Sequence, residues 1–176
     1  ENVLSEAFGG LVRLEAKDGL GGSNRSHVLR CNLLEGPANV PASVVVKQAI
    51  AGGDEVYNPD SPKGPAWRLF NDWAGLQFLS EVAGDASPAP RFYGGDRESG
   101  LIVIEDLGTG ESLDKLLLAN QPAAAEAGLI KLATTLGRMH AFTIGKRPEY
   151  DRIRNALGPR SARNASTTSE QRHLIG

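Results

Sequence analysis

The chain has 176 residues, of which 40% are hydrophobic and 23% charged, and its formal net charge is -2. This length can bury the core of one domain, or one and a half, and the composition is ordinary for a soluble globular protein. The balanced charge argues against a nucleic-acid or membrane-surface protein, and the apolar runs are too short to span a bilayer. The single cysteine, Cys31, excludes an internal disulfide. With no amino-terminal signal visible, we expect a cytoplasmic protein in which Cys31 is an inert packed thiol.

Three strands are predicted at the start of the chain. Alternating apolar residues favour a strand at residues 10–16 and a returning strand at residues 27–34, joined by a turn rich in glycine. After a loop with two prolines, the run Val44-Val45-Val46 predicts a third strand, residues 43–47, buried on both faces. These strands should form an antiparallel meander.

A helix is predicted next, beginning at Pro65 and running to about residue 83. Leu69, Trp73 and Leu76 share one face of it, and Asp72 lies at the edge of that face, about 60° from Leu69. Residues 91–93 and 101–105 then predict a hairpin whose second strand is buried, which gives five strands with one inserted helix.

The character of the sequence becomes helical after a hinge-like segment, Leu107-Gly108-Thr109-Gly110. Helices are predicted at residues 113–118, 122–142 and 152–157. His140 falls on the apolar side of the second of these, so we expect a hydrogen-bonded core histidine. Residues 160–170 are polar and predicted to be mobile. No metal-ligand spacing is present.

The glycine-rich turn before Val28 has three interpretations. In a dinucleotide-binding unit such glycines lead into a helix, but here a strand follows, so we reject that interpretation. In a kinase-type hairpin the glycines join two strands and their N–H groups cover phosphates. The kinase pattern maps with Gly21 first and Val28 last, with Ser23 and Ser26 at the other two glycine positions. An ordinary glycine-rich hairpin turn remains open.

Lys47 ends the buried third strand, where its ammonium must reach water or an anion. A kinase has its phosphate-binding lysine at this place, and Val28 and Val45 would then form a wall for adenine. A helical carboxylate should hold the lysine, and Asp72 qualifies by its face. The alternatives are a solvated lysine and an edge aspartate in water.

Several segments, in this order and spacing, resemble the aminoglycoside phosphotransferase family, which includes choline kinases and has a protein-kinase-like fold. The segments are Gly21-Gly22-Ser23-Asn24, Val44-Val45-Val46-Lys47, residues 72–79, residues 90–94, Ile104-Glu105-Asp106-Leu107-Gly108 and Leu136-Gly137-Arg138-Met139-His140. The resemblance covers about residues 10–145. It implies an α+β fold with a nucleotide-binding lobe at residues 1–107, followed by a hinge and the first helices of an incomplete carboxy-terminal lobe at residues 108–176.

The resemblance also implies a function, an ATP-dependent small-molecule kinase that uses ATP and Mg²⁺ to phosphorylate a hydroxyl group. Gly21, Gly22, Ser23 and Asn24 would cap the phosphates, and Lys47, steadied by Asp72, would neutralise the α- and β-phosphates. The backbone of Glu105, Asp106 and Leu107 would hydrogen-bond the adenine edge. The family normally has glutamate at the position of Asp72, so either the helix sits closer, a water bridges, or the pair does not form.

The catalytic and metal-binding aspartates of such a kinase have no counterpart in the sequence. After residue 145 the only aspartate is Asp151, at the start of a predicted helix, so we expect the catalytic loop and the Mg²⁺ ligands outside this chain. A non-catalytic, pseudokinase-like nucleotide-binding module and an interaction domain remain alternatives. Aminoglycoside, choline, amino alcohol and sugar acceptors all stay open, as does the oligomeric state.

Overall fold

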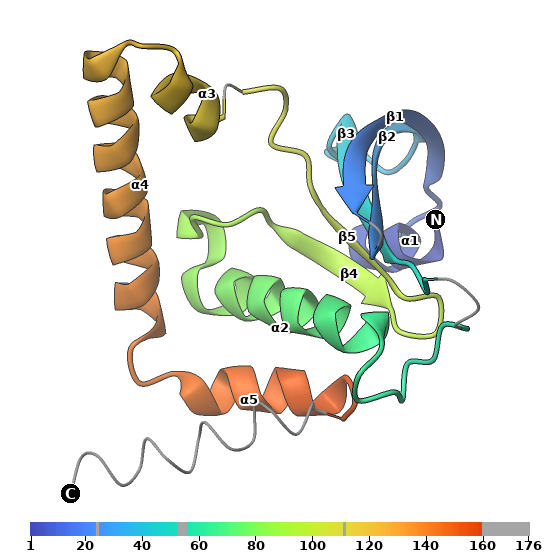
Figure 1. The fold of residues 1–176 in the computed structure, drawn as a ribbon. Helices are drawn as coiled ribbons and strands as arrows, with labels where there is room; N and C mark the ends of the chain where they lie inside the picture. Colours follow the sequence, from blue (N-terminus) through green and yellow to red (C-terminus); the bar gives the residue numbers. More distant parts are fainter. Residues whose placement is uncertain (24, 53–55, 111, 160–176) are drawn as a thin grey trace, which may run out of the picture.

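The computed structural model describes residues 1–23, 25–52, 56–110 and 112–159. The described chain is an α+β protein in which one antiparallel sheet of five strands packs between helices (Figure 1). The helices are α1 Asn2–Phe8, α2 Pro65–Ala83, α3 Leu113–Leu118, α4 Pro122–Thr143 and α5 Arg147–Ala156, with a 3₁₀ turn, η1, at Gly84–Ala86. The strands are β1 Arg13–Ser23, β2 Ser26–Glu35, β3 Ser43–Ala49, β4 Phe92–Asp96 and β5 Leu101–Glu105.

The sheet has the order β1-β2-β3-β5-β4, and all neighbouring strands are antiparallel. The predicted meander and the predicted hairpin are therefore both confirmed, and they join because β5 pairs with β3. The register places Lys47 opposite Val28 on one side and Ile102 on the other. Since side chains alternate along a strand, Val45, Lys47 and Ala49 share one face of β3.

The glycine-rich segment differs from the predicted turn, because most of it belongs to β1. Pairing continues outward to Ser23 opposite Ser26, so Gly19, Gly21 and Gly22 lie within the strand. The register shifts between Gly19 and Gly22, and Gly21 has a φ of 96°, a conformation that favours glycine. The glycines therefore permit an irregular strand near the hairpin tip rather than forming the loop itself.

The two faces of the sheet are covered by different helices. Leu4 of α1 packs on one face against a buried cluster with Val12, Cys31, Val44 and Val103. Burial raises the pKa of the Cys31 thiol, consistent with the predicted inert, packed cysteine. On the other face Leu69 of α2 packs against Ala49 and Ile102.

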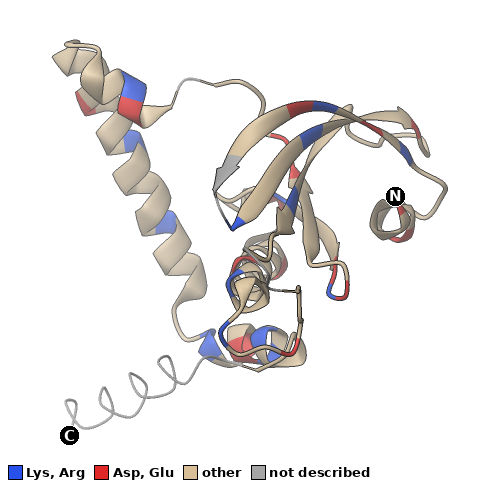
Figure 2. Ribbon diagram, turned by 45° about the vertical axis from the view of Figure 1, so that its right-hand side comes forward, with Lys and Arg blue, Asp and Glu red and all other residues tan. Residues whose placement is uncertain are grey.

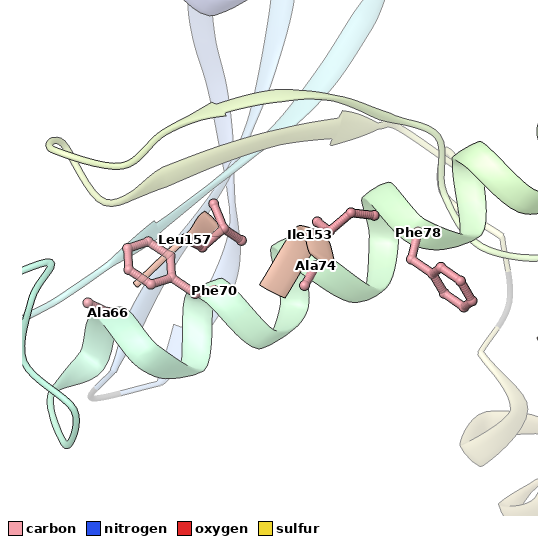
Figure 3. Packing of buried hydrophobic residues seen from close by; sticks show 6 residues of the cluster. All are labelled: Ala66, Phe70, Ala74, Phe78, Ile153 and Leu157. Carbon is pink, nitrogen blue, oxygen red and sulfur yellow. The ribbon is translucent and has the colours of Figure 1, made fainter. Parts of the chain in front are cut away.

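Helix α2 is buried on two sides. Leu69 and Trp73 face the sheet, while a second row with a spacing of four residues faces α5 (Figure 3). This second row is Ala66, Phe70, Ala74 and Phe78, and it contacts Ile153 of α5 and Leu157, the C-cap of that helix. The layers are thus α1, sheet, α2 and α5. The predicted start and end of α2 are both confirmed, with Pro65 in the first turn and Gly84 as the C-cap, at a positive φ of 52°.

Two predicted boundaries are wrong for identifiable reasons. Strand β4 begins at Phe92 and continues through Gly94 and Gly95 to Asp96, beyond the predicted residues 91–93. Glycine is required at position 95 of this strand because the Trp73 ring occupies the space that a Cβ would need. Helix α5 begins at Arg147 instead of residue 152, with Pro148 in its first turn.

Two further expectations also fail. The first predicted strand starts at Arg13 rather than residue 10, because α1 and its C-cap Gly9 precede it. The apolar side of α4 is 41–47% exposed at Leu129, Leu132 and Leu136, and His140 is exposed as well. The described chain does not cover this side, so His140 is not the predicted core histidine. The predicted mobile segment, residues 160–170, lies outside the described residues.

Charged residues of both signs are spread over the sheet and the helices (Figure 2). This distribution fits the nearly neutral net charge of -2. None of the helices in the described ranges combines the length and the apolar character needed to cross a bilayer.

Replacing Phe70 by alanine should test the packing of α2 on α5. Phe70 is almost fully buried among Ala66, Ile153 and Leu157, so Phe70→Ala should lower the free energy of unfolding by about 3–5 kcal/mol. Chemical denaturation monitored by circular dichroism measures the change. Leu118→Ala on the exposed side of α3 is the control and should cost less than about 0.5 kcal/mol. Equal losses in the two variants would contradict this account of the core.

Candidate functional site

Lys47 and Asp72 form the ion pair that the sequence predicts. The Nζ of Lys47 donates a hydrogen bond to Oδ2 of Asp72 over 2.6 Å. Their side chains remain 31% and 46% exposed, so neither charge is removed from water. Because the contact is direct, the shorter aspartate side chain needs no bridging water.

The backbone of α2 brings Asp72 to this position. Leu69, one turn before Asp72, packs against Ala49 and Ile102 and fixes the helix on the sheet. The small side chain of Ala49, two residues after Lys47 on the same face of β3, leaves room for the helix to lie close. This packing brings the short side chain of Asp72 within direct reach of Lys47.

A cavity of about 370 Å³ opens beside this pair, between the hairpin tip of β1 and β2 and the first turns of α2. Its lining includes Lys47 of β3 and Arg68, Asn71 and Asp72 of α2. Arg25 and Ser26 line it from the hairpin. Three basic side chains and one carboxylate give the cavity a cationic character, which suits an anionic ligand.

A second cavity of about 420 Å³ continues this surface toward the loop before α2. Arg25 and Arg68 line both cavities, and Lys63 lines the second. Both volumes fall in the range of small-molecule sites, roughly 300–1,000 Å³. The two cavities together form a cationic surface that is large enough to hold more than one phosphate group.

Among the predicted site residues that the structure describes, two, Lys47 and Asp72, line the first cavity. Val28 lies directly opposite Lys47 on β2, while Val45 lies two residues before Lys47 on the same face and is buried. Gly21, Gly22 and Ser23 belong to β1 and approach the cavity as one arm of its hairpin. Asn24 lies outside the described residues.

Glu105, Asp106 and Leu107 lie at the other end of the sheet face, where β5 ends. Glu105 is held by Arg91, whose backbone N–H donates to the Glu105 carboxylate and whose carbonyl accepts from the Glu105 N–H. Leu107 is exposed. The structure thus separates the predicted adenine-edge residues from the Lys47 cavity, with Val45 on the face between them.

A pair that the sequence analysis missed joins the end of β5 to β2. Arg30 donates from Nε to Oδ2 of Asp106 over 2.7 Å and from Nη2 to Oδ1 over 2.9 Å. Ser43 donates its hydroxyl to the same carboxylate over 2.7 Å, and the N–H of Gly108 donates to it over 2.9 Å. Arg30 also donates to the carbonyl of Gly108. The side chains of Arg30 and Asp106 are only 13% and 6% exposed.

The hydrogen bonds from Arg30 and then Ser43 lower the pKa of Asp106 from 3.8 to about 2. Asp106 therefore stays ionised at neutral pH and fixes the first residues after β5 against β2. A partial signal was present in the sequence, because Arg30 interrupts the apolar strand and Asp106 follows a buried one. The partnership itself spans 76 residues, and only the strand order β2-β3-β5 brings the two together.

Comparisons with known proteins add no family assignment. No family model matches the chain, and no curated protein is significantly similar to it.

Replacing Asp106 by asparagine should destabilise the chain in a pH-dependent manner. At pH 7 Asp106→Asn should lower the free energy of unfolding by about 1–3 kcal/mol, because a buried charge-assisted network loses its anion. The folded-state pKa of Asp106 lies below its ordinary value, so its contribution is present above about pH 4 and is lost as the pH falls toward 2. The difference between wild type and variant should shrink over that interval in denaturation curves.

Asp85→Asn is the matched control for this prediction. Asp85 pairs with Arg91 on the surface and is 92% exposed, so its loss should change stability by less than about 0.5 kcal/mol. A stability difference for Asp106→Asn that stays constant from pH 6 to pH 2 would show that the carboxylate charge does not hold residues 106–108 against β2.

Proposed function

We propose that this chain is the nucleotide-binding part of an ATP-dependent phosphotransferase that acts on a hydroxyl group of a small molecule. The observation that carries the proposal is the Lys47–Asp72 pair at the edge of a cationic cavity, next to a glycine-containing hairpin. A lysine on the third strand paired with a helical carboxylate is the arrangement that protein-kinase-like enzymes use for phosphates. The sheet order and the single helix inserted after β3 support the kinase-like interpretation of the fold.

Lys47 would neutralise the α- and β-phosphates. An ammonium has three donors, and Asp72 accepts one of them, which leaves donors for phosphate oxygens. Asp72 restricts the rotamers of the flexible lysine side chain before the nucleotide arrives, so less conformational entropy is lost on binding. Backbone N–H groups near Gly21 and Gly22 at the hairpin tip would cover the phosphates from above.

The adenine would lie on the sheet face between Lys47 and the end of β5. Val45 and, opposite Lys47, Val28 provide apolar surface on this face, and the backbone from Glu105 to Leu107 would present the hydrogen-bonding edge. The Arg30–Asp106 pair holds this backbone at a fixed distance from β2. A rigid edge of this kind favours one orientation of a planar base.

Mg²⁺ would accompany ATP in such a reaction, but the described residues contain no cluster of His, Cys, Asp or Glu that could hold a metal ion. We therefore assign no metal-binding role to them. The part of this chain is to bind and orient the nucleotide through Lys47, Asp72 and the glycine hairpin.

A second candidate function is a non-catalytic nucleotide-binding or interaction module. The exposed apolar side of α4, formed by Leu129, Ile130, Leu132 and Leu136, favours an interaction role. Calorimetry with ATP separates the candidates: an interaction domain without a nucleotide site gives no binding. A pseudokinase-like module would bind ATP and transfer no phosphoryl group.

Removing the lysine should weaken nucleotide binding. Lys47→Ala should raise the Kd for ATP by roughly tenfold or more, because charge-assisted hydrogen bonds to the phosphates are lost. Isothermal titration calorimetry measures the affinity. Lys131→Ala on the exposed surface of α4 removes the same charge far from the cavity and should leave the Kd unchanged. An unchanged Kd in Lys47→Ala would remove this residue from the proposed site.

Replacing Asp72 by asparagine should separate binding from stability. The pair is partly exposed, so Asp72→Asn should change the free energy of unfolding by less than about 1 kcal/mol. ATP affinity should still fall by several fold, because Lys47 loses the partner that orients it. The same titration and a thermal melt measure both quantities, and wild-type ATP affinity would make Asp72 a bystander.

A further inference from the structure

Arg154 of α5 is a buried cation next to the Lys47 cavity. Its side chain is 1% exposed, and a guanidinium so placed must be met by acceptors. Its Nε donates to Oδ1 of Asn71 over 2.7 Å, and its Nη1 donates to the carbonyl of Gly158 over 3.0 Å. Arg154 therefore connects the end of α5 to a residue in the middle of α2.

This contact fixes the orientation of the Asn71 amide. A guanidinium has donors only, so it is the oxygen of Asn71 that must face Arg154. The amide NH₂ group, which carries two donors, is then directed away from Arg154. Asn71 also lines the 370 Å³ cavity, together with Lys47 and Arg68.

We propose that Asn71 is a phosphate-binding residue of this cavity, with its NH₂ group held toward the ligand by Arg154. The ligand class is the polyphosphate of a nucleotide, so this inference rests on the proposed function. Asn71 and Asp72, which are adjacent in α2, then have different roles in the same cavity. Asp72 orients the lysine, and Asn71 supplies neutral donors to oxygens that Lys47 does not reach.

The variant that separates the two sides of Asn71 is Asn71→Asp. The new carboxylate keeps an oxygen for Arg154 and strengthens that contact by adding charge, so the melting temperature should equal or exceed that of wild type. Its second oxygen replaces the NH₂ group and turns a donor into an anion facing the cavity. Affinity for ATP-Mg²⁺ and for inorganic tripolyphosphate should fall roughly tenfold or more in calorimetric titrations.

The added carboxylate also repels phosphates directly, so the neutral variant Asn71→Ala makes the distinction: a purely structural Asn71 predicts wild-type ligand affinity in Asn71→Ala. Asn155→Asp is the charge control: it adds the same charge to an exposed position of α5 beside Arg154, outside the cavity lining, and should bind both ligands as wild type does. Asn71→Ala removes the donors without adding charge and should weaken binding by several fold. It decides the question if Asn71→Asp does not fold.

The outcomes for Asn71 and for the proposed function are distinguishable. Wild-type affinities in Asn71→Asp and Asn71→Ala, with Lys47→Ala impaired, would overturn the role of Asn71 and leave the nucleotide site standing. Absence of ATP and tripolyphosphate binding in the wild-type chain would overturn both. Weaker binding in both Asn71→Asp and the neutral Asn71→Ala, with an unchanged or raised melting temperature in Asn71→Asp and a normal Asn155→Asp control, supports the proposal.

Discussion

The packing of α2 on two sides at once is the constraint on which the rest of the structure depends. One row of its side chains is buried against the sheet and a second against α5, so the helix can neither roll nor slide without exposing apolar surface. The positions between these rows, among them Arg68, Asn71 and Asp72, are thereby placed at the rim of one cavity. The cationic cavity is thus a consequence of how a hydrophobic helix is held.

Asp106 and Asp72 differ in burial, and this difference determines whether a ligand can compete for their cationic partners. Asp106 accepts hydrogen bonds from Arg30, Ser43 and Gly108 and is almost completely enclosed. Asp72 accepts one from Lys47 and remains half in water. A ligand phosphate can compete for an exposed lysine at little cost, whereas breaking the enclosed pair would leave buried charges without partners.

Much of the fold could be predicted from local patterns in the sequence. The run Leu101-Ile102-Val103-Ile104 located β5, and Pro65 marked the start of α2. The contact of Asp72 with Lys47 was an expectation from the kinase-type pattern, in which a helical carboxylate holds the lysine, and the helical face of Asp72 singled out this residue. The hairpin tip was misplaced because glycines usually end strands, whereas here β1 continues through them.

The parts of the site that could not be predicted depend on contacts between distant segments. Arg30 meets Asp106 only because β5 pairs with β3, and Arg154 meets Asn71 only because α5 folds back beneath α2. In the sequence each of these residues is simply a charged or polar position without a visible partner. Periodicity indicates which face a side chain occupies but not which distant segment covers that face.

The attachment of Gly108 to Arg30 has a consequence for movement of the helical part of the chain. Arg30 holds the carbonyl of Gly108, and Asp106 holds its N–H, so the first three residues after Glu105 move with the sheet as one body. Any movement of α3 and α4 relative to the sheet must therefore take place in the chain after Gly108, which leaves only a few residues before α3 begins at Leu113.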